Sequence, residues 1–400
     1  WVLPWIGWLS CPRGSSMTDG GSALGPREPA GRELSTAARS TLVVALLYLF
    51  LTGVELLSGG FKTMGAGFVD GLFEGVSNPV AGLFVGLLAT VLVQSSSVST
   101  SVIVGLVASG VVGADEAVPM IMGANLGTTV TNTLASLGHM RRDLEFRRAF
   151  AAATVHDFFN ILAVIVFLPL ELATGYLSST AGWITEQVIG SSGAEFNSPL
   201  KAAVKMPAGW VKDLLSGVGA GGNWMGGLMI LIGLVFIFLA LAYITRNMRL
   251  LVADRVEAAI NRTLGAGSGL VAILLGAIIT VSVQSSSITT SVLVPLAASG
   301  VLTLENIYPV TLGANVGTTV TALLAALATG NPAAVTVAVV HTLFNVSGIA
   351  LFYPIRALRR IPLRLAAGLA DVAAERRSTA FVYALGMFVV IPLIGVMVLR

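Results

Sequence analysis

Two blocks of this sequence are nearly identical and lie 190 residues apart. Residues 90–112 read TVLVQSSSVSTSVIVGLVASGVV, residues 280–302 read TVSVQSSSITTSVLVPLAASGVL, and 16 of the 23 positions are identical. At the same offset, residues 119–137 and 309–327 share 12 of 19 positions, including the sequence GANxGTTVT. Chance does not produce matches of this length, so the chain is a duplicated structural unit.

The amino-acid composition indicates that this duplicated unit lies in a membrane. Charged residues make up 11% of the chain and apolar residues 55%, whereas a soluble chain is about one quarter charged. So few charges cannot cover a surface in water, so lipid must be the solvent. The net charge of +3 comes from residues scattered among apolar segments and predicts no nucleic-acid partner. The single cysteine, Cys11, excludes an internal disulfide framework.

Charge-poor stretches predict where the chain crosses the membrane, because a spanning helix needs roughly 20 apolar residues. The predicted spans are residues 40–60, 117–137, 149–170, 226–245, 307–329, 333–353 and 379–399. Two further stretches, 75–114 and 263–304, have no charged residue, are too long for one helix and have the polar QSSS sequence at their centres. Each of them predicts a re-entrant helical hairpin with a polar tip.

The positions of the arginines predict the orientation of the two halves, because cytoplasmic loops are enriched in Lys and Arg. Arginines gather in residues 141–148, 246–262 and 356–377, whereas residues 174–213 balance lysines against acids. Placing the three basic segments inside puts the N-terminus in the cytoplasm. The two hairpins then enter from opposite faces, so the repeats are inverted and the QSSS tips meet near the midplane.

The resulting organisation is an all-α polytopic membrane protein in six parts. They are a disordered N-terminal arm (1–39), a first transmembrane repeat (40–173), an extracytoplasmic connecting loop (174–225), a second transmembrane repeat (226–355), a basic cytoplasmic loop (356–378) and a C-terminal transmembrane helix (379–400).

The residues at the hairpin tips favour an anion together with a cation. Helix N-termini offer N–H groups and partial positive charge to an anion, and Ser, Thr, Gln and Asn oxygens are hard ligands that suit Na⁺. Neither QSSS block nor GANxGTT block contains Lys or Arg. Since burying an unpaired multivalent anion is very costly, the pattern favours cation-coupled anion symport. The alternative is packing, in which Ser and Thr bond back to their own helix and glycines only allow close contact.

Other side chains give weaker signals. His156 recurs in the second half as His341, but Asp157 is replaced there by Thr342. We interpret the histidines as interhelical hydrogen-bonding residues, with proton coupling as the alternative. The acids near the first span, Glu55, Asp70 and Glu74, are interpreted as interfacial. No transition-metal site and no GxSxG nucleophile sequence is present, so the sequence predicts neither a catalytic residue nor a cofactor.

Four sequence features together resemble the type II sodium-dependent phosphate cotransporter family. They are the paired VQSSS sequences, the two GANxGTT blocks, FRRAFAAATVHDFFN at residues 146–160 and LPLELATGYL at residues 168–177. The resemblance covers most of residues 40–400. It implies inward symport of inorganic phosphate with Na⁺, an inverted-repeat fold of the elevator type, a location in the cell membrane and no enzymatic activity.

The resemblance also assigns candidate ligands. Phosphate would be bound by Ser95, Ser96, Ser97, Ser285, Ser286 and Ser287. Sodium would be bound by Gln94, Asn125, Thr128, Thr129, Gln284, Asn315, Thr318 and Thr319. Animal members of the family have a large disulfide-bonded loop between the halves, and the short cysteine-free segment here predicts a prokaryotic member. A Na⁺ symporter for sulfate or a dicarboxylate, a channel and a non-transporting scaffold remain as alternatives, and a homo-oligomer is left open.

Overall fold

The computed structural model describes residues 35–64, 78–189, 199–219, 221–264 and 269–399, and all regular structure in them is helical. The predicted disordered arm up to residue 34, together with Asp70 and Glu74, lies outside the described residues. The first half contains α1 (Thr36–Met64), α3 (Pro79–Val93), α4 (Ser96–Ser109), α5 (Ala114–Gly127), α6 (Val130–Ser136), the 3₁₀ turn η2 (Leu137–His139), α7 (Asp143–Thr174) and α8 (Tyr176–Ile189).

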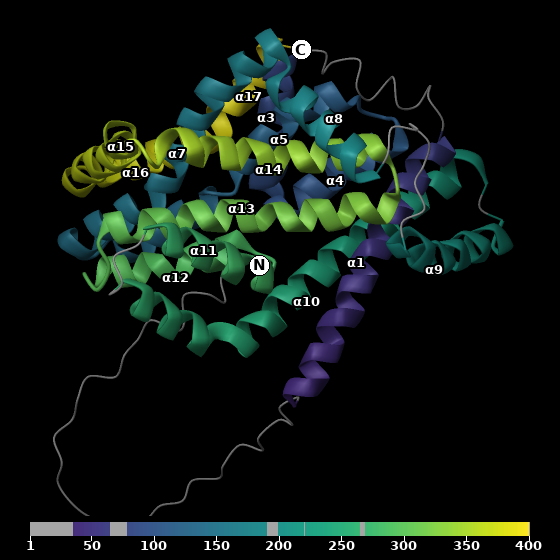
Figure 1. Ribbon diagram of the computed structural model, residues 1–400, viewed down its shortest axis with the longest axis horizontal. Coiled ribbons are helices and arrows are strands. Elements are labelled where there is room, and N and C mark those ends of the chain that lie inside the picture. Colours follow the sequence, from purple (N-terminus) through teal and green to yellow (C-terminus); the bar gives the residue numbers. More distant parts are fainter. Residues whose placement is uncertain (1–34, 65–77, 190–198, 220, 265–268, 400) are drawn as a thin grey trace, which may run out of the picture.

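The helix α9 (Pro199–Gly217) connects the first half to the second. The remaining elements are α10 (Gly222–Leu264), α11 (Gly269–Val283), α12 (Ser286–Ala298), α13 (Leu304–Thr329), α14 (Pro332–Phe352), α15 (Arg356–Glu375), α16 (Arg377–Leu385), the π-helical turn η3 (Gly386–Val390) and α17 (Ile391–Leu399). Figure 1 shows α13 and α14 running along the middle of the molecule, with α1 crossing α10 at its edge.

Six of the helices in the described part of the chain are long and apolar enough to cross a membrane. They are α1, α7, the Gly222–Met248 part of α10, α13, α14 and the continuous stretch Arg377–Leu399. They coincide with six of the predicted spans. The seventh predicted span, residues 117–137, is divided between α5 and α6, with the break at Thr128 and Thr129. The helices α3, α4, α11 and α12 are too short to cross a bilayer, as expected for the arms of hairpins.

Glycines allow the backbones of α1 and α10 to approach closely. A Cβ added at Gly53 of α1 would lie 2.8 Å from the carbonyl oxygen of Gly233, and one at Gly60 would lie 2.8 Å from that of Gly226. The two glycines of each helix are seven residues apart and therefore lie on one face of it. This antiparallel glycine contact joins the first helix of one half to the first helix of the other.

Matching glycines also bring each hairpin against the helix that carries GANxGTT. A Cβ at Gly123 of α5 would overlap the carbonyl oxygen of Leu83 in α3. In the second half, a Cβ at Gly313 of α13 would overlap the carbonyl oxygen of Ile273 in α11. These two motif glycines therefore serve close helix packing, as the packing alternative predicts.

The second arm of each hairpin packs on the opposite half of the chain. The helix α4 contacts α13 and α14, and α12 contacts α6 and α7. Because α4 and α12 pack in this way, their N-terminal ends lie in the interior, where Ser96, Ser97 and Ser286 are buried. The polar tips are therefore positioned by both halves together.

Segments predicted as connecting loops contain helices. Residues 174–225 include α8 and α9, and residues 356–378 include α15. In α15 the residues Pro362, Ala366, Ala370 and Ala373 are buried at intervals of three or four, and the helix packs against α7. This spacing gives the helix one apolar face, which its basic composition obscures. The six-part division of the chain remains a prediction.

Candidate functional site between the two hairpin tips

Each hairpin turns at a glutamine in a left-handed backbone conformation. Gln94 has φ 57° and Gln284 has φ 56°, and they are the only non-glycine residues with positive φ in the part of the chain that the structure describes. This conformation costs an L-residue roughly 1–2 kcal/mol. Because strain of this kind clusters at functional sites, its recurrence at both matched turns makes them candidate functional positions.

The two glutamine side chains are held in the same way. Each Nε2 donates to the carbonyl oxygen three residues earlier, at 2.5 Å for Gln94 and 2.6 Å for Gln284. Each Oε1 accepts from a threonine of the adjacent GANxGTTVT block, from Thr131 at 3.4 Å and from Thr321 at 2.9 Å. The structure thus adds Thr131 and Thr321 to the residues around the predicted site.

The two tips contact each other across the repeats, as the duplicated sequence predicts. The hydroxyl of Ser97 donates to the backbone carbonyl of Gln284 at 3.4 Å. Further contacts join α6 to α12. Asn132 Nδ2 donates to Thr290 Oγ1 at 2.7 Å, and Ser291 donates to Asn132 Oδ1 at 3.2 Å. Asn132 has no amide counterpart in the second half, where the matched residue is Ala322.

Four of the six predicted phosphate-binding serines form two matched pairs. Ser95 and Ser285 are the N-caps of α4 and α12, and each hydroxyl accepts a backbone N–H three residues later at 3.4 Å. Ser96 and Ser286 are only 5% and 2% exposed, and their hydroxyls have no hydrogen-bond partner among the described residues.

The helix ends at these serines suit an anion. The first N–H groups of α4 and α12 have no partner within their own helices, and helix N-termini carry partial positive charge. Two such ends meet here with the buried hydroxyls of Ser96 and Ser286 beside them. The arrangement can therefore bind an anion without a full positive charge from the protein.

The predicted sodium-binding threonines bond back to their own helices. Thr128, Thr129, Thr318 and Thr319 donate to the carbonyl oxygens of Ala124, Leu126, Ala314 and Val316, at 3.2, 3.0, 3.0 and 2.7 Å. A hydroxyl that donates in this way keeps its lone pairs, so these bonds are compatible with cation ligation and also with the packing alternative.

The other two predicted sodium ligands, Asn125 and Asn315, belong to a buried network with the histidines. His156 of α7 contacts Asn315 Oδ1 of α13 at 2.5 Å, and His341 of α14 contacts Asn125 Oδ1 of α5 at 3.3 Å. Each histidine therefore bonds to the opposite half of the chain. The predicted interhelical hydrogen bonding of both histidines is confirmed.

Asn160 and Asn345 complete this network. Asn160 Oδ1 accepts from Asn125 at 3.2 Å and from Asn315 at 2.7 Å, and Asn345 Oδ1 accepts from Asn125 at 3.2 Å. Neither was predicted as a site residue, although both follow phenylalanine at matched positions of the repeats. The network occupies the amides of Asn125 and Asn315, so these side chains hold the two halves together.

Asp157 is a further buried residue of this site, and its sequence context indicates no specific role for it. Its Oδ2 accepts from Thr133 at 3.2 Å and from Tyr383 at 3.0 Å, which joins α7 to α6 and α16. Its Oδ1 is buried and has no hydrogen-bond partner among the described residues. A carboxylate in a membrane-spanning helix is costly and usually functional, and this open oxygen is suited to a cation.

Duplicated halves, interrupted membrane helices and a polar site where the two halves meet are the architecture of a secondary transporter. The model of the Na⁺/Pi-cotransporter family matches residues 49–182 and 235–366 of this chain. The chain belongs to this family.

The similar proteins include sodium-dependent phosphate transport proteins of mammals. The chain is 33% identical to sodium-dependent phosphate transport protein 2B of Homo sapiens, over 94% of this chain and 68% of that protein. It is 35% identical to sodium-dependent phosphate transport protein 2A of Rattus norvegicus, over 88% of this chain and 66% of that protein. No solved structure matches the chain. The prokaryotic assignment stays a prediction.

Proposed function

We propose that this protein is a symporter that moves inorganic phosphate across a membrane together with Na⁺. Membership of the Na⁺/Pi-cotransporter family supports the substrates. The observation that carries the proposal is the meeting of two serine-capped helix N-termini, with the unpaired hydroxyls of Ser96 and Ser286 buried between the halves.

In this mechanism phosphate lies between the two tips. The hydroxyls of Ser96, Ser286 and Ser287 and the free N–H groups of α4 and α12 donate to its oxygens. Ser97 joins them when its hydroxyl turns from the carbonyl oxygen of Gln284 to phosphate. The capping serines Ser95 and Ser285 fix the helix ends and act on phosphate through them. No lysine or arginine belongs to these tips.

Sodium supplies the charge that the tips lack. The amide oxygens of Gln94 and Gln284 and the adjacent threonine hydroxyls provide neutral oxygen ligands, and Asp157 provides a buried negative charge. A dianion without a counter-charge is very costly in this interior. Binding of phosphate is therefore coupled to prior or simultaneous binding of Na⁺.

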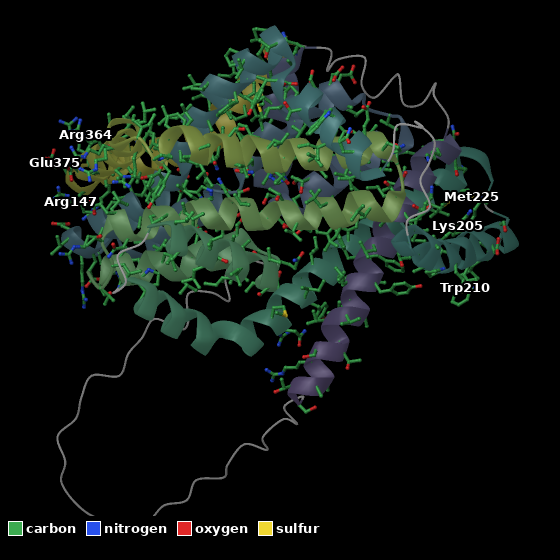
Figure 2. The ribbon with its side chains drawn as sticks, in the orientation of Figure 1. Arg147, Lys205, Trp210, Met225, Arg364 and Glu375 are labelled. Carbon is green, nitrogen blue, oxygen red and sulfur yellow. The ribbon has the colours of Figure 1, made fainter. Side chains whose placement is uncertain are left out.

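We also propose a topology for the chain, in which the two repeats are inverted and the N-terminus lies in the cytoplasm. Figure 2 places Arg147, Arg364 and Glu375 at one end of the molecule and Lys205 and Trp210 at the other. Trp183, Trp210 and Trp224 are exposed by 62%, 66% and 80% in the segments around α9, as expected where tryptophans meet a membrane–water interface. The arginine end would face the cytoplasm.

An elevator-type movement would slide the hairpins past the α1–α10 pair. Gly105 of α4 lies against Leu57 of α1, since an added Cβ would be 2.9 Å from Leu57 Cδ2. A disulfide between Gly105→Cys and Leu57→Cys, in a Cys11→Ser background, should stop transport, and a reductant should restore it. Unchanged transport by fully cross-linked protein would exclude this movement.

Uptake of radiolabelled phosphate into proteoliposomes tests the function itself. An inward Na⁺ gradient should drive accumulation of phosphate above the external concentration, and a K⁺ gradient should not. If unlabelled sulfate or a dicarboxylate inhibited this uptake as strongly as unlabelled phosphate does, phosphate would not be the specific substrate. Equilibration without accumulation would indicate a channel, and no flux at all would indicate a scaffold.

A further inference from the structure

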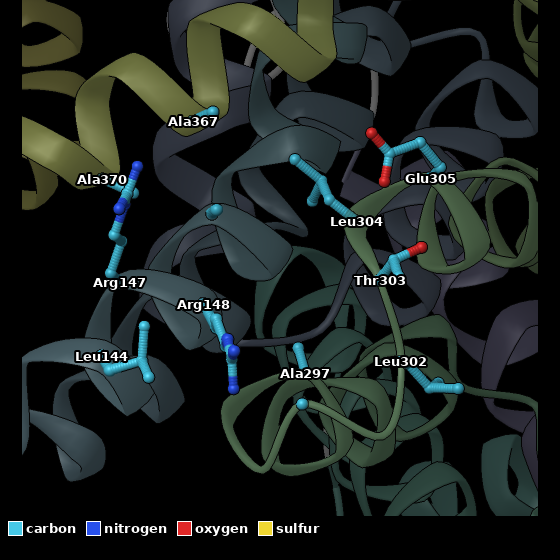
Figure 3. Close-up of a pocket in the computed structure, with 12 residues that line it drawn as sticks. Leu144, Arg147, Arg148, Ala297, Leu302, Thr303, Leu304, Glu305, Ala367 and Ala370 are labelled. Atoms are coloured by element: carbon cyan, nitrogen blue, oxygen red, sulfur yellow. The ribbon is translucent and has the colours of Figure 1, made fainter.

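A cavity of 470 Å³ lies at the arginine-rich end of the protein, away from the hairpin tips. It is bounded by the start of α7, the turn between α12 and α13, and α15 (Figure 3). Its walls are mostly apolar and include Leu144, Ala297, Leu302 and Ala367, whereas Arg147 and Arg148 stand at its edge. An apolar chamber beside two guanidinium groups suits a ligand with an anionic head and an apolar tail.

Arg148 lines the cavity and has no acidic partner among the described residues. No ion pair or hydrogen bond joins it to another described residue, whereas the neighbouring Arg147 pairs with Asp371 of α15. The guanidinium of Arg148 lies against Gly300, so that a Cβ at Gly300 would collide with Arg148 Nη1. Figure 3 shows Arg148 directed toward the α12–α13 turn, with Glu305 on the other side of the cavity.

The matched turn of the first half is held in a different way among the described residues. The matched turn contains Gly110, which has φ +81° like Gly300 at +79°, but an added Cβ at Gly110 would contact nothing. That turn is held by Asn331, which donates to the carbonyl oxygen of Ala108 at 3.1 Å. At the offset that relates His156 to His341, the residue matching Arg148 is Ala333. Closing such a turn therefore does not require an arginine.

The exposed surface of α15 continues the same charge pattern. Arg356, Arg360 and Arg364 are exposed and four residues apart, so they form one stripe along the helix. Ile361 and Leu365 form the neighbouring stripe and are 37% and 42% exposed. A basic stripe beside an exposed apolar stripe is typical of helices at a membrane interface, where anionic headgroups gather.

We propose that this cavity binds one anionic glycerophospholipid. Its phosphate group pairs with Arg148, and the first part of an acyl chain lies along Leu144, Ala297 and Leu302. The predominantly apolar wall and the adjoining interfacial helix favour a lipid over a free phosphate. The bound lipid connects the base of the second hairpin to α7, so it stabilises this arrangement of the two halves.

Thermal unfolding of the purified protein in a neutral detergent tests the proposal. Phosphatidylglycerol should raise the Tm in a saturable way, and phosphatidylcholine or glycerol 3-phosphate should not. Arg148→Gln should need roughly tenfold more phosphatidylglycerol for the same rise, because a charge-assisted contact to phosphate is lost. Arg141→Gln removes an exposed arginine that does not line the cavity and should respond like the unchanged protein.

A second variant tests the apolar part of the cavity. Ala367→Phe should fill the space and lower the response to phosphatidylglycerol while leaving both arginines in place. Ser96→Ala should respond normally, because it alters only the proposed transport site. If Arg148→Gln does not fold, Arg148→Lys takes its place, because lysine keeps the positive charge. The purified Arg148→Lys protein should retain bound lipid, which native mass spectrometry can detect.

Three outcomes would overturn the proposal. Equal stabilisation by phosphatidylcholine would show that the headgroup charge is irrelevant. A response to phosphatidylglycerol that neither Arg148→Gln nor Ala367→Phe reduces would place the lipid elsewhere. Stabilisation by glycerol 3-phosphate that Arg148→Gln abolishes would identify a site for a soluble phosphate ester instead of a lipid.

Discussion

Replacement of the central serines by alanine separates phosphate binding from packing. Ser96→Ala and Ser286→Ala each remove one oxygen atom from a buried side chain that makes no hydrogen bond with a described residue. No hydrogen bond to a described residue is lost, so the thermal stability of the ligand-free protein should change little. If these hydroxyls bind phosphate, each variant loses a hydrogen bond to a charged group, which is worth about 1.5–3 kcal/mol.

This energy sets the size of the expected effect. Since 1.4 kcal/mol corresponds to a factor of ten, the apparent affinity for phosphate should fall roughly 10- to 100-fold in each variant. The free N–H groups of the helix ends remain, so the maximal rate of uptake should fall less than the affinity. Stabilisation by added phosphate should decrease by up to about 1.4 kcal/mol for each tenfold loss of affinity, because it depends on the logarithm of the ratio of ligand concentration to dissociation constant.

Two serines outside the tips provide matched controls. Ser109 donates to the carbonyl oxygen of Leu106 at the far end of α4, at 2.7 Å, and Ser282 donates to that of Ile278 in α11, at 2.8 Å. Ser109→Ala and Ser282→Ala should leave phosphate affinity unchanged. The reasoning would be refuted if Ser96→Ala and Ser286→Ala also bound phosphate with normal affinity and were stabilised normally by it.

Three further predictions concern the surroundings of the tips. Asp157→Asn should weaken Na⁺ dependence more than phosphate affinity, as measured by uptake at varied Na⁺, and an unchanged Na⁺ dependence would exclude it as a cation site. Gly123→Ala should destabilise the protein by about 1–3 kcal/mol because a methyl group overlaps backbone, whereas Gly138→Ala, with open space around it, should not lower the Tm. A double-mutant cycle of Asn132→Ala and Thr290→Ala should give a coupling energy of about 1 kcal/mol for their contact, and strict additivity would show that the contact is energetically unimportant.

The sequence predicts most of the helices and the meeting of the tips. Hydropathy locates the spanning helices because lipid requires long apolar segments, and the repeat indicates that two equivalent hairpins exist. The back-bonded state of Thr128 and Thr318 is not predictable, since a threonine that ligates and one that bonds to its own helix have the same sequence pattern. Similarly, the many arginines of residues 356–377 favour a loop in the sequence, and the small apolar face of α15 becomes evident only from its packing on α7.

Contacts between distant segments are the part that sequence reasoning could not supply. Asp157 is bonded by Tyr383, 226 residues later, and nothing in the local sequence of either residue specifies the partner. The left-handed conformation of Gln94 and Gln284 is also hidden, because glutamine is not a residue that signals positive φ. In the sequence, only the repeated QSSS indicates that the chain turns at these two positions.

The two halves match at most site residues but differ at Asp157, and this difference indicates how the site can be asymmetric. The serine caps, the turn glutamines and the histidine–asparagine contacts recur in both halves, so they form a site with matched contributions from each. Asp157, matched by Thr342, places a carboxyl group on one side of that site only. A symmetric set of neutral ligands suits a substrate held between the halves, whereas a single buried carboxylate gives one cation position a different affinity from its counterpart. Sodium would therefore bind the two halves unequally, with Asp157 determining which half binds it more tightly.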